Sequence, residues 1–221
     1  MRCAESGGKR RFRAGRGQAR GVAALLGVLL ALASLPAPAQ QPLPRYAADP
    51  VHSTVVFAVD HLGFSQSIGR FRVREMDLRF DPERWAESRV EAVIDIGSID
   101  LADAGWNRTM LGRRWFRAAD FPEARFRSIR VTPTGENRAD IEGELTLLGV
   151  TRPVTLAARL NRIGSNLYAG GRLWIGFSAT ATLSRSAFGM DADPKAVGDT
   201  VELRIEIEGP RRDRPNPPSK R

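Results

Sequence analysis

The segment TVELRIEIE (200–208) decides the fold class of this chain, because its apolar and charged side chains alternate without a break. In an extended strand the apolar residues fall on one face and the charged residues on the other. The apolar face consists of Val201, Leu203, Ile205 and Ile207. Such a strand is half buried, as in an antiparallel sheet that wraps around its own core. We therefore expect an all-β protein.

Alternating runs of this kind recur along the chain. They lie at 53–61, 68–80, 89–96, 124–131, 138–148, 152–160 and 167–183. With the closing run this makes eight strands, and an even number lets the last strand pair antiparallel with the first. We predict an eight-stranded antiparallel β-barrel, with a two-sheet sandwich as the competing arrangement. The apolar phase changes after Val73, which predicts a β-bulge near Arg74–Glu75.

One segment departs from the period of two. Between Asp103 and Arg117, large apolar residues recur at helical spacing with basic residues between them. These apolar residues are Trp106, Met110, Leu111 and Trp115. We expect one short amphipathic α-helix, inserted between the third and fourth strands.

The connections between strands make the two ends of the barrel unlike. In an up-and-down barrel the first, third, fifth and seventh connections emerge at the same end. Two of these are long, the insert 97–123 and the loop SRSAFGMDADPKAVGDT (184–200). Long irregular connections in compact domains are often functional. The aromatic residues of these two connections are Trp106, Trp115, Phe121 and Phe188. They predict that this end of the barrel is an opening, or mouth, covered by aromatic side chains.

The two ends of the chain differ in composition from the rest. Residues 1–39 combine seven basic residues with an apolar run of about 15 residues and small residues up to Ala39. We expect a signal peptide that is cleaved near Ala39, and hence a periplasmic or secreted protein; an uncleaved anchor is the alternative. Residues 210–221 are basic and proline-rich, which predicts a disordered tail. The folded domain is assigned to 40–209.

The formal net charge of +9 belongs to these two ends. Residues 40–209 hold 22 basic and 23 acidic residues, a net charge of −1. A nucleic-acid-binding domain needs a basic surface, so nucleic acid is not an expected partner. The single cysteine, Cys3, lies in the expected signal peptide, so the domain has no disulfide and no thiolate metal ligand.

The two histidines, His52 and His61, are the obvious candidates for catalysis or metal binding. Their odd separation places them on opposite faces of one strand and roughly 30 Å apart. They cannot share a metal ion, and no third histidine completes a zinc site. His61 shares the parity of Phe57 and Val59, so we expect it to point inward at the mouth. There it is either a hydrogen-bonded core residue or a contact for a ligand head group.

Several ordered motifs resemble the YceI family of polyisoprenoid-binding periplasmic proteins. They are DPVHSTVVFAVDHLG (49–63), IGRF (68–71), IDIGSID (94–100), FPEARFRS (121–128), GELTLLGVTRPVTL (143–156), GFSATATLSRSAFGM (176–190) and VGDTVEL (197–203). The similarity covers about 46–208. It carries over the family positions His52, Ser53, Phe57, His61, Gly63, Gly69, Phe71, Arg185, Phe188 and Gly189. The chain has Met110 where the family often has histidine, and Ala187 where an acidic residue is frequent.

The resemblance implies a lipocalin-like β-barrel that binds one long isoprenoid chain in an apolar tunnel without catalysis. We expect the apolar wall to include Phe57, Val59, Phe71, Leu111, Trp115, Phe121, Phe126, Phe177 and Phe188. Candidate contacts for the head group are His61, Arg108 and Arg185. For each wall residue, plain core packing is the alternative interpretation.

The leading hypothesis is therefore an exported carrier of a long-chain isoprenoid or similar fatty lipid, with no other cofactor and no metal. Two alternatives stay open. The first is a lipid-modifying hydrolase or isomerase that uses His61 inside the barrel. The second is a structural adaptor domain of the cell envelope. Transient membrane contact and a homodimer are also left open.

Overall fold

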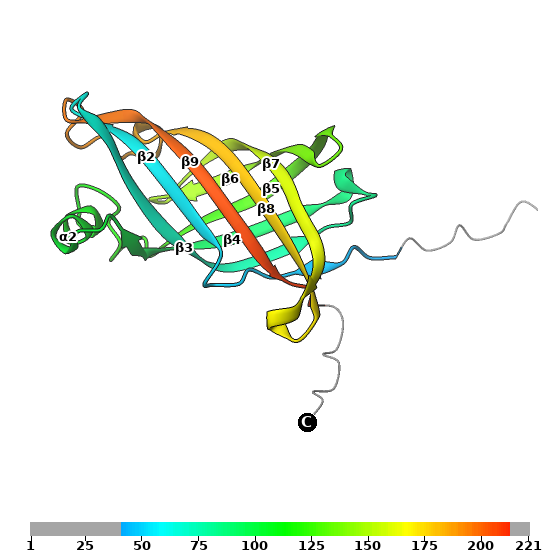
Figure 1. The fold of residues 1–221 in the computed structure, drawn as a ribbon. Coiled ribbons are helices and arrows are strands. Elements are labelled where there is room, and N and C mark those ends of the chain that lie inside the picture. Colours follow the sequence, from blue (N-terminus) through cyan, green and yellow to red (C-terminus); the bar gives the residue numbers. More distant parts are fainter. Residues whose placement is uncertain (1–40, 213–221) are drawn as a thin grey trace, which may run out of the picture. The chain divides into compact units, whose positions relative to one another are not determined.

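The structure is a computed structural model that describes residues 41–212, and Figure 1 shows a single β-barrel. Eight antiparallel strands form its ring: β2 (Thr54–His61), β3 (Ser65–Arg79), β4 (Arg89–Asp100), β5 (Glu123–Gly135), β6 (Arg138–Leu147), β7 (Val150–Asn166), β8 (Arg172–Ser184) and β9 (Val197–Pro210). Neighbours in sequence pair with each other, and β2 pairs with β9 to close the ring. The predicted all-β, eight-stranded antiparallel barrel is confirmed. An additional two-residue strand, β1 (Arg45–Tyr46), pairs with the last residues of β3.

The predicted β-bulge is present in β3. Val73 pairs with Ile94 and Glu75 pairs with Val93, so Arg74 is the extra residue in the ladder. The bulge shifts the inward phase by one position, from Phe71 and Val73 to Met76 and Leu78, all of which are buried. A bulge thus lets one long strand keep an apolar inner face on both sides of the irregularity.

Strand β8 starts later than its alternating run predicts. Residues 167–171 form a 3-10 turn, Leu167–Ala169, followed by two glycines with positive φ. The side chain of Asn166 accepts hydrogen bonds from the backbone N–H groups of Tyr168 and Ala169. This local capping competes with strand pairing and moves the start of β8 to Arg172.

The helix lies where it is predicted, between β4 and β5, but it is shorter than the sequence pattern. Helix α2 spans Ala104–Leu111, and the carboxylate of its N-cap, Asp103, accepts from the Trp106 N–H at 2.7 Å. It ends at Gly112, because glycine is costly inside a helix. The expected continuation to Arg117 is wrong; the following turns instead donate to the last helical carbonyls. No helix within 41–212 is long and apolar enough to cross a bilayer.

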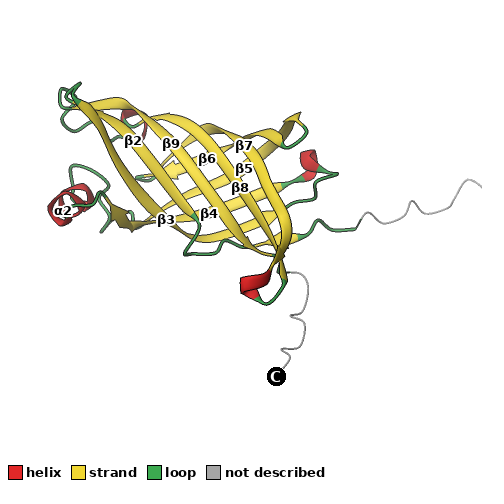
Figure 2. Cartoon of the chain, in the orientation of Figure 1, coloured by secondary structure: helices red, strands yellow, loops and turns green. Residues whose placement is uncertain are grey.

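The four predicted mouth connections do meet at one end of the barrel, together with α2 (Figure 2). The β2–β3 turn bonds to the β8–β9 loop through Leu62 N–H and the Ala196 carbonyl, at 2.8 Å. Arg114, which follows α2, pairs with Asp193 of the same loop at 2.7 Å. We call this end the mouth.

The opposite end of the barrel is closed by aromatic rings. Phe80, Trp85 and Phe177 pack edge to face, with ring centroids 4.8 to 6.1 Å apart. Trp85 belongs to a short 3-10 helix, Trp85–Glu87, before β4. Tyr46 of β1 joins the same buried cluster. We call the three edge-to-face rings of Phe80, Trp85 and Phe177 the floor.

Candidate functional site

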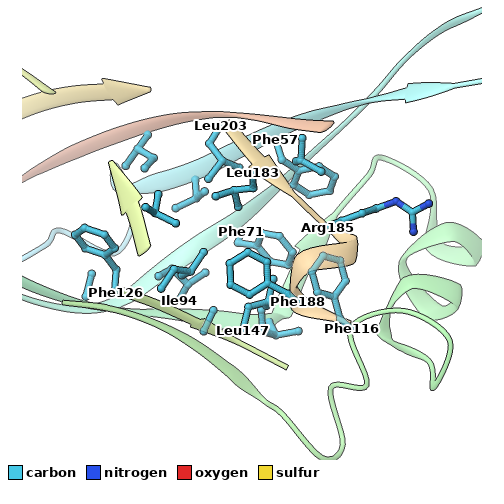
Figure 3. Close-up of a pocket in the computed structure, with 18 of the residues that line it drawn as sticks. Phe57, Phe71, Ile94, Phe116, Phe126, Leu147, Leu183, Arg185, Phe188 and Leu203 are labelled. Atoms are coloured by element: carbon cyan, nitrogen blue, oxygen red, sulfur yellow. The ribbon is translucent and has the colours of Figure 1, made fainter. Parts of the chain in front are cut away.

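The barrel encloses a cavity of about 200 Å³ between the mouth and the floor. All eight ring strands contribute side chains to its wall, and the mouth segments contribute Met110, Phe116 and Met190. Figure 3 shows Phe57, Leu183 and Leu203 on one side and Ile94, Phe126 and Leu147 on the other. The lining is apolar except for one residue, Arg185. The inward faces of the strands therefore leave part of the interior unfilled.

The cavity has an apolar extension toward the floor. A second space of about 80 Å³ lies beside Phe80, Trp85 and Phe177. It shares five lining residues with the larger cavity, which are Met76, Val90, Leu156, Ile205 and Ile207. The two spaces are thus neighbours along the barrel. Movement of a shared side chain such as the flexible Met76 would join them.

Aromatic residues shape the mouth side of the cavity. Phe71 stacks on Phe57 at 5.4 Å between ring centroids and meets Phe116 edge-on at 5.2 Å. Phe188 belongs to a 3-10 turn, Ser186–Phe188, directly after β8, and it is almost fully buried. These rings, which Figure 3 shows together, cover the interior at the end where the chain connections are longest.

Arg185 is a buried cation at the same end and is only 6% exposed. Its guanidinium donates three hydrogen bonds of 2.8 Å to backbone carbonyls, those of Met190, Val197 and Gly198. The charge also lies 5.6 Å from the ring centroid of Trp115. Because a guanidinium has five N–H groups, two remain beyond these three bonds. The side chain thus fastens the β8–β9 loop and lines the cavity at once.

The β8–β9 loop is held at its start by a carboxylate. Asp199 accepts from the Ser184 hydroxyl at 2.6 Å and from the Ser186 backbone N–H at 2.9 Å. These hydrogen bonds, together with the charge of Arg185, lower the pKa of the Asp199 carboxyl below its ordinary value. Asp199 therefore stabilises the turn that carries Phe188.

Seven of the twelve predicted site residues line the cavity. They are Phe57, Val59, Phe71, Trp115, Phe126, Arg185 and Phe188. They come from β2, β3, β5 and the segments that follow α2 and β8, so they are far apart in sequence. The fold brings them together because each inward position of a closed barrel faces the same interior.

His61 is not among the residues that line the cavity. Its pairing with β3 is regular and its partner on β9, Val197, lines the cavity, so His61 keeps the parity of Val59 at the mouth end of β2. The imidazole instead lies 6.0 Å from the Trp106 ring of α2, measured between ring centroids.

The other four predicted site residues also lie outside the cavity wall. Phe177 faces inward but belongs to the floor. Phe121 packs in the mouth-side core cluster, with the Arg117 guanidinium 4.9 Å from its ring centroid. Leu111 packs against the same cluster, whereas Arg108 is exposed on α2.

Several lining residues were not predicted as site residues. The inner face of β9 contributes Val201, Leu203, Ile205 and Ile207. The regular alternation of this segment was a sufficient signal, since it identifies all four as inward. Met190 carried no comparable signal, because it lies in an irregular loop whose path depends on Arg185.

Within residues 41–212 the structure contains no group of three or more histidine, cysteine or acidic side chains that could hold a metal ion. His52 lies near the closed end, where its Nδ1 is 3.3 Å from the Asp49 carboxylate. The two histidines thus occupy separate environments, one beside Asp49 and one beside Trp106.

Comparison with known proteins assigns this barrel to a family. The model of the YceI-like domain matches residues 46–209, which is most of the chain. This chain belongs to the YceI-like family. It is 33% identical to a UPF0312 protein of Vibrio parahaemolyticus over 174 residues, covering 76% of this chain and 90% of the relative. A UPF0312 protein of Pseudomonas savastanoi is 33% identical over 158 residues, covering 72% and 81%.

Two solved structures share the fold of this chain. BcnA of Burkholderia cenocepacia superimposes with a TM-score of 0.66 at 26% identity, covering 73% of this chain and 99% of BcnA. A polyisoprenoid binding domain from Saccharophagus degradans superimposes with a TM-score of 0.58 at 13% identity, covering 77% and 99%. At that identity the second comparison shows the fold alone.

Proposed function

We propose that this protein is an exported carrier that holds one long-chain isoprenoid or similar amphiphilic lipid inside the barrel. The observation that carries the proposal is the apolar cavity of about 200 Å³, which continues toward the floor. An apolar cavity of roughly 150 Å³ in a protein stays dry and takes up benzene. The present cavity thus has room for a branched hydrocarbon segment without any rearrangement.

The energy of such binding comes from removing hydrocarbon from water. Each buried methylene contributes about 0.8 kcal/mol, so a few isoprene units are held without specific bonds. A longer chain needs the space near the floor as well, and Met76 lines both that space and the main cavity. Methionine has three rotatable bonds and adapts readily to a new neighbour. A tail that lies along the barrel axis therefore fits the shape of the interior.

The comparisons support the ligand class. The Saccharophagus degradans domain, which shares the fold, is described as polyisoprenoid binding. Membership of the YceI-like family points in the same direction.

We assign the head-group contact to Arg185. Arg185 lines the cavity at the mouth end, and Figure 3 shows its guanidinium directed away from the apolar wall. Two N–H groups of this guanidinium remain beyond the three bonded to carbonyls. A lipid that enters tail first places its polar end at this position. An oxygen acceptor on that end would complete the hydrogen bonding of the buried cation.

The lining favours binding over catalysis. Among the residues described, Arg185 is the one ionisable side chain that lines the main cavity, and Arg89 is the one that lines the space near the floor. A hydrolase or isomerase would need an acid, a base or a nucleophile there. His61, the candidate for that role, lies outside the wall. The adaptor hypothesis requires a filled barrel, which this interior is not.

The proposal includes export, which is inferred from the composition of residues 1–39. These residues lie outside the described region, and so does most of the basic tail. The proposed location is the periplasm or the exterior, after cleavage near Ala39. Amino-terminal sequencing of protein recovered from the periplasmic fraction tests this part separately.

Mass spectrometry tests the carrier directly. The natively purified protein is weighed intact and again after denaturation, and the released material is identified. The expected result is one bound isoprenoid or fatty lipid per chain, which denaturation releases. A chain that never carries added mass, and that takes up no apolar compound on incubation, contradicts the proposal. His61→Gln is expected to retain the ligand unchanged, whereas loss of a turnover activity in this variant would favour the enzyme hypothesis.

A further inference from the structure

Three large apolar side chains are exposed around the mouth. Leu62 and Phe64 form the β2–β3 turn and are 51% and 86% exposed, and Trp106 of α2 is 50% exposed. The turn is tight, because Leu62 and Gly63 both have positive φ and the Phe64 N–H donates to the His61 carbonyl. Leu62 and Phe64 thus stand exposed at the tip of the turn. These three residues and three exposed cations near them, Arg108, Arg113 and Lys195, are called the rim.

Contacts place the turn and the helix side by side. His61, which precedes the turn, lies 6.0 Å from Trp106 between ring centroids. Figure 1 shows the β2–β3 turn, the β8–β9 loop and α2 at the same end of the barrel. Single exposed apolar residues are common on protein surfaces and need no explanation. Three around the entrance to an apolar cavity form a group with a shared position.

Cations without an ion pair accompany these apolar side chains. Arg108 of α2, Arg113 directly after it and Lys195 of the β8–β9 loop are exposed, and no ion pair to them is found within the described chain. Lys195 precedes Ala196, whose carbonyl bonds the β2–β3 turn. The carboxylate of Asp193 in the same loop is occupied by Arg114. The rim thus combines Leu62, Phe64, Trp106, Arg108, Arg113 and Lys195.

We propose that the rim docks on the surface of a phospholipid bilayer that carries anionic head groups, so that the mouth faces the lipid. Aromatic side chains with an apolar body prefer the interface between head groups and acyl chains. Arginine and lysine beside them are attracted to anionic head groups. The inference rests on the proposed function, because a carrier of a water-insoluble chain must exchange it with a membrane.

Docking of the rim on a bilayer would shorten the path of the lipid through water. A lipid that leaves the bilayer through the mouth passes from hydrocarbon to the aromatic wall formed by Phe71, Phe116 and Phe188. Its tail would otherwise cross water, at a cost of about 0.8 kcal/mol for each exposed methylene. Contact between rim and bilayer shortens that path. Leu62, Phe64 and Trp106 lie at the end of the barrel where this contact would form.

Vesicle flotation tests the proposal. The mature protein is mixed with vesicles of phosphatidylcholine alone, or of phosphatidylcholine and phosphatidylglycerol in equal parts. We expect binding to the anionic vesicles, and a roughly tenfold or greater loss of it in the double variant Phe64→Ser, Trp106→Ser. Both side chains are exposed, so the fold is not expected to change. Equal binding by the wild type and this variant would overturn the proposal.

The chain provides a matched control at its other end. Leu167 and Tyr168, in the β7–β8 turn near the closed end, are also highly exposed apolar residues. The double variant Leu167→Ser, Tyr168→Ser is expected to bind vesicles like the wild type. A loss equal to that of the rim variant would show non-specific adhesion and overturn the proposal. All variants keep the same basic tail, so the comparison isolates the rim from the tail's own attraction to anionic lipid.

Two further measurements separate the parts of the proposal. Trp106 is the most exposed of the four tryptophans, so brominated lipid should quench the fluorescence of the protein in the wild type more than in Trp106→Ser. Equal binding to neutral vesicles would refute the role of the cations. The lipid content of the rim variant, measured by mass spectrometry, should equal that of the wild type. Protein that holds no lipid but still binds vesicles would refute the carrier function and support the docking of the rim on membranes.

Discussion

Filling the cavity should abolish binding without unfolding the barrel, and Ala124→Phe is the substitution that does this most directly. Ala124 lies on β5, is buried, and lines the cavity. A phenyl ring on this residue points into a space of about 200 Å³. Since benzene fills an apolar cavity of roughly 150 Å³, the ring would occupy most of that space.

The expected magnitude follows from the displaced hydrocarbon. Six ring carbons exclude about as many ligand carbons, and at about 0.8 kcal/mol each this amounts to roughly 5 kcal/mol as an upper limit. Flexible neighbours such as Met76 can move and make room for the ligand, which reduces this loss of binding free energy. We expect the affinity to fall at least about 100-fold, which corresponds to about 2.7 kcal/mol. Burial of the ring contributes about 1.5–3 kcal/mol of stability and strain costs about 1–3 kcal/mol, so the free energy of unfolding should change little.

The assay uses titration with the apolar fluorophore N-phenyl-1-naphthylamine, together with native mass spectrometry of the co-purifying lipid. Ala157→Phe is the matched control, because Ala157 is exposed on the outer face of β7, where phenylalanine suits a strand. The control should bind like the wild type. A folded Ala124→Phe protein that retains ligand at wild-type affinity would refute the assignment of the ligand to this cavity.

Three further predictions concern stability. Arg185→Met leaves three loop carbonyls without their donor, so unfolding in urea should occur at a clearly lower concentration, with a loss of about 3 kcal/mol; an unchanged midpoint would contradict the fastening role. Gly69→Ala places a Cβ about 2.7 Å from Cε1 of Phe57, so calorimetry should show a loss of about 1–3 kcal/mol; an unaltered melting temperature would show that the ring moves freely. The lowered pKa of Asp199 stabilises the fold at pH above the ordinary carboxyl value of 3.8, and this contribution is lost as pH falls through the lower pKa of the folded protein. In Asp199→Asn the free energy of unfolding should therefore fall less steeply as the pH is lowered into the acid range. The same acid dependence in the variant and the wild type would contradict this role of Asp199.

The sequence alone was sufficient for the strands, because these follow from local alternation, whereas the choice of a closed barrel over a two-sheet sandwich needed the pairing of β2 with β9. The inner face of β9 and the phase change at Arg74 could be read residue by residue. The β6–β7 hairpin is equally local, since Leu148 and Gly149 adopt the positive φ values that a two-residue turn requires.

The surroundings of single side chains needed the tertiary structure. His61 shares the parity of Phe57, yet it is not part of the cavity wall, and its ring centroid lies 6.0 Å from that of Trp106. Phe177 does face inward, yet the long β8 carries it to the floor. Arg185 gave no sign in the sequence that three carbonyls of a later loop surround it.

The sequence by itself determined the antiparallel strands, the apolar face of each strand and the place of the helix between two of them. Only the tertiary structure decided that the sheet closes into a barrel and that the inner face leaves a cavity. Alternation states which side chains point inward, but not whether they meet. That depends on the radius of the ring and on the rings of Phe71, Phe116 and Phe188, whose positions come from segments far apart in the chain.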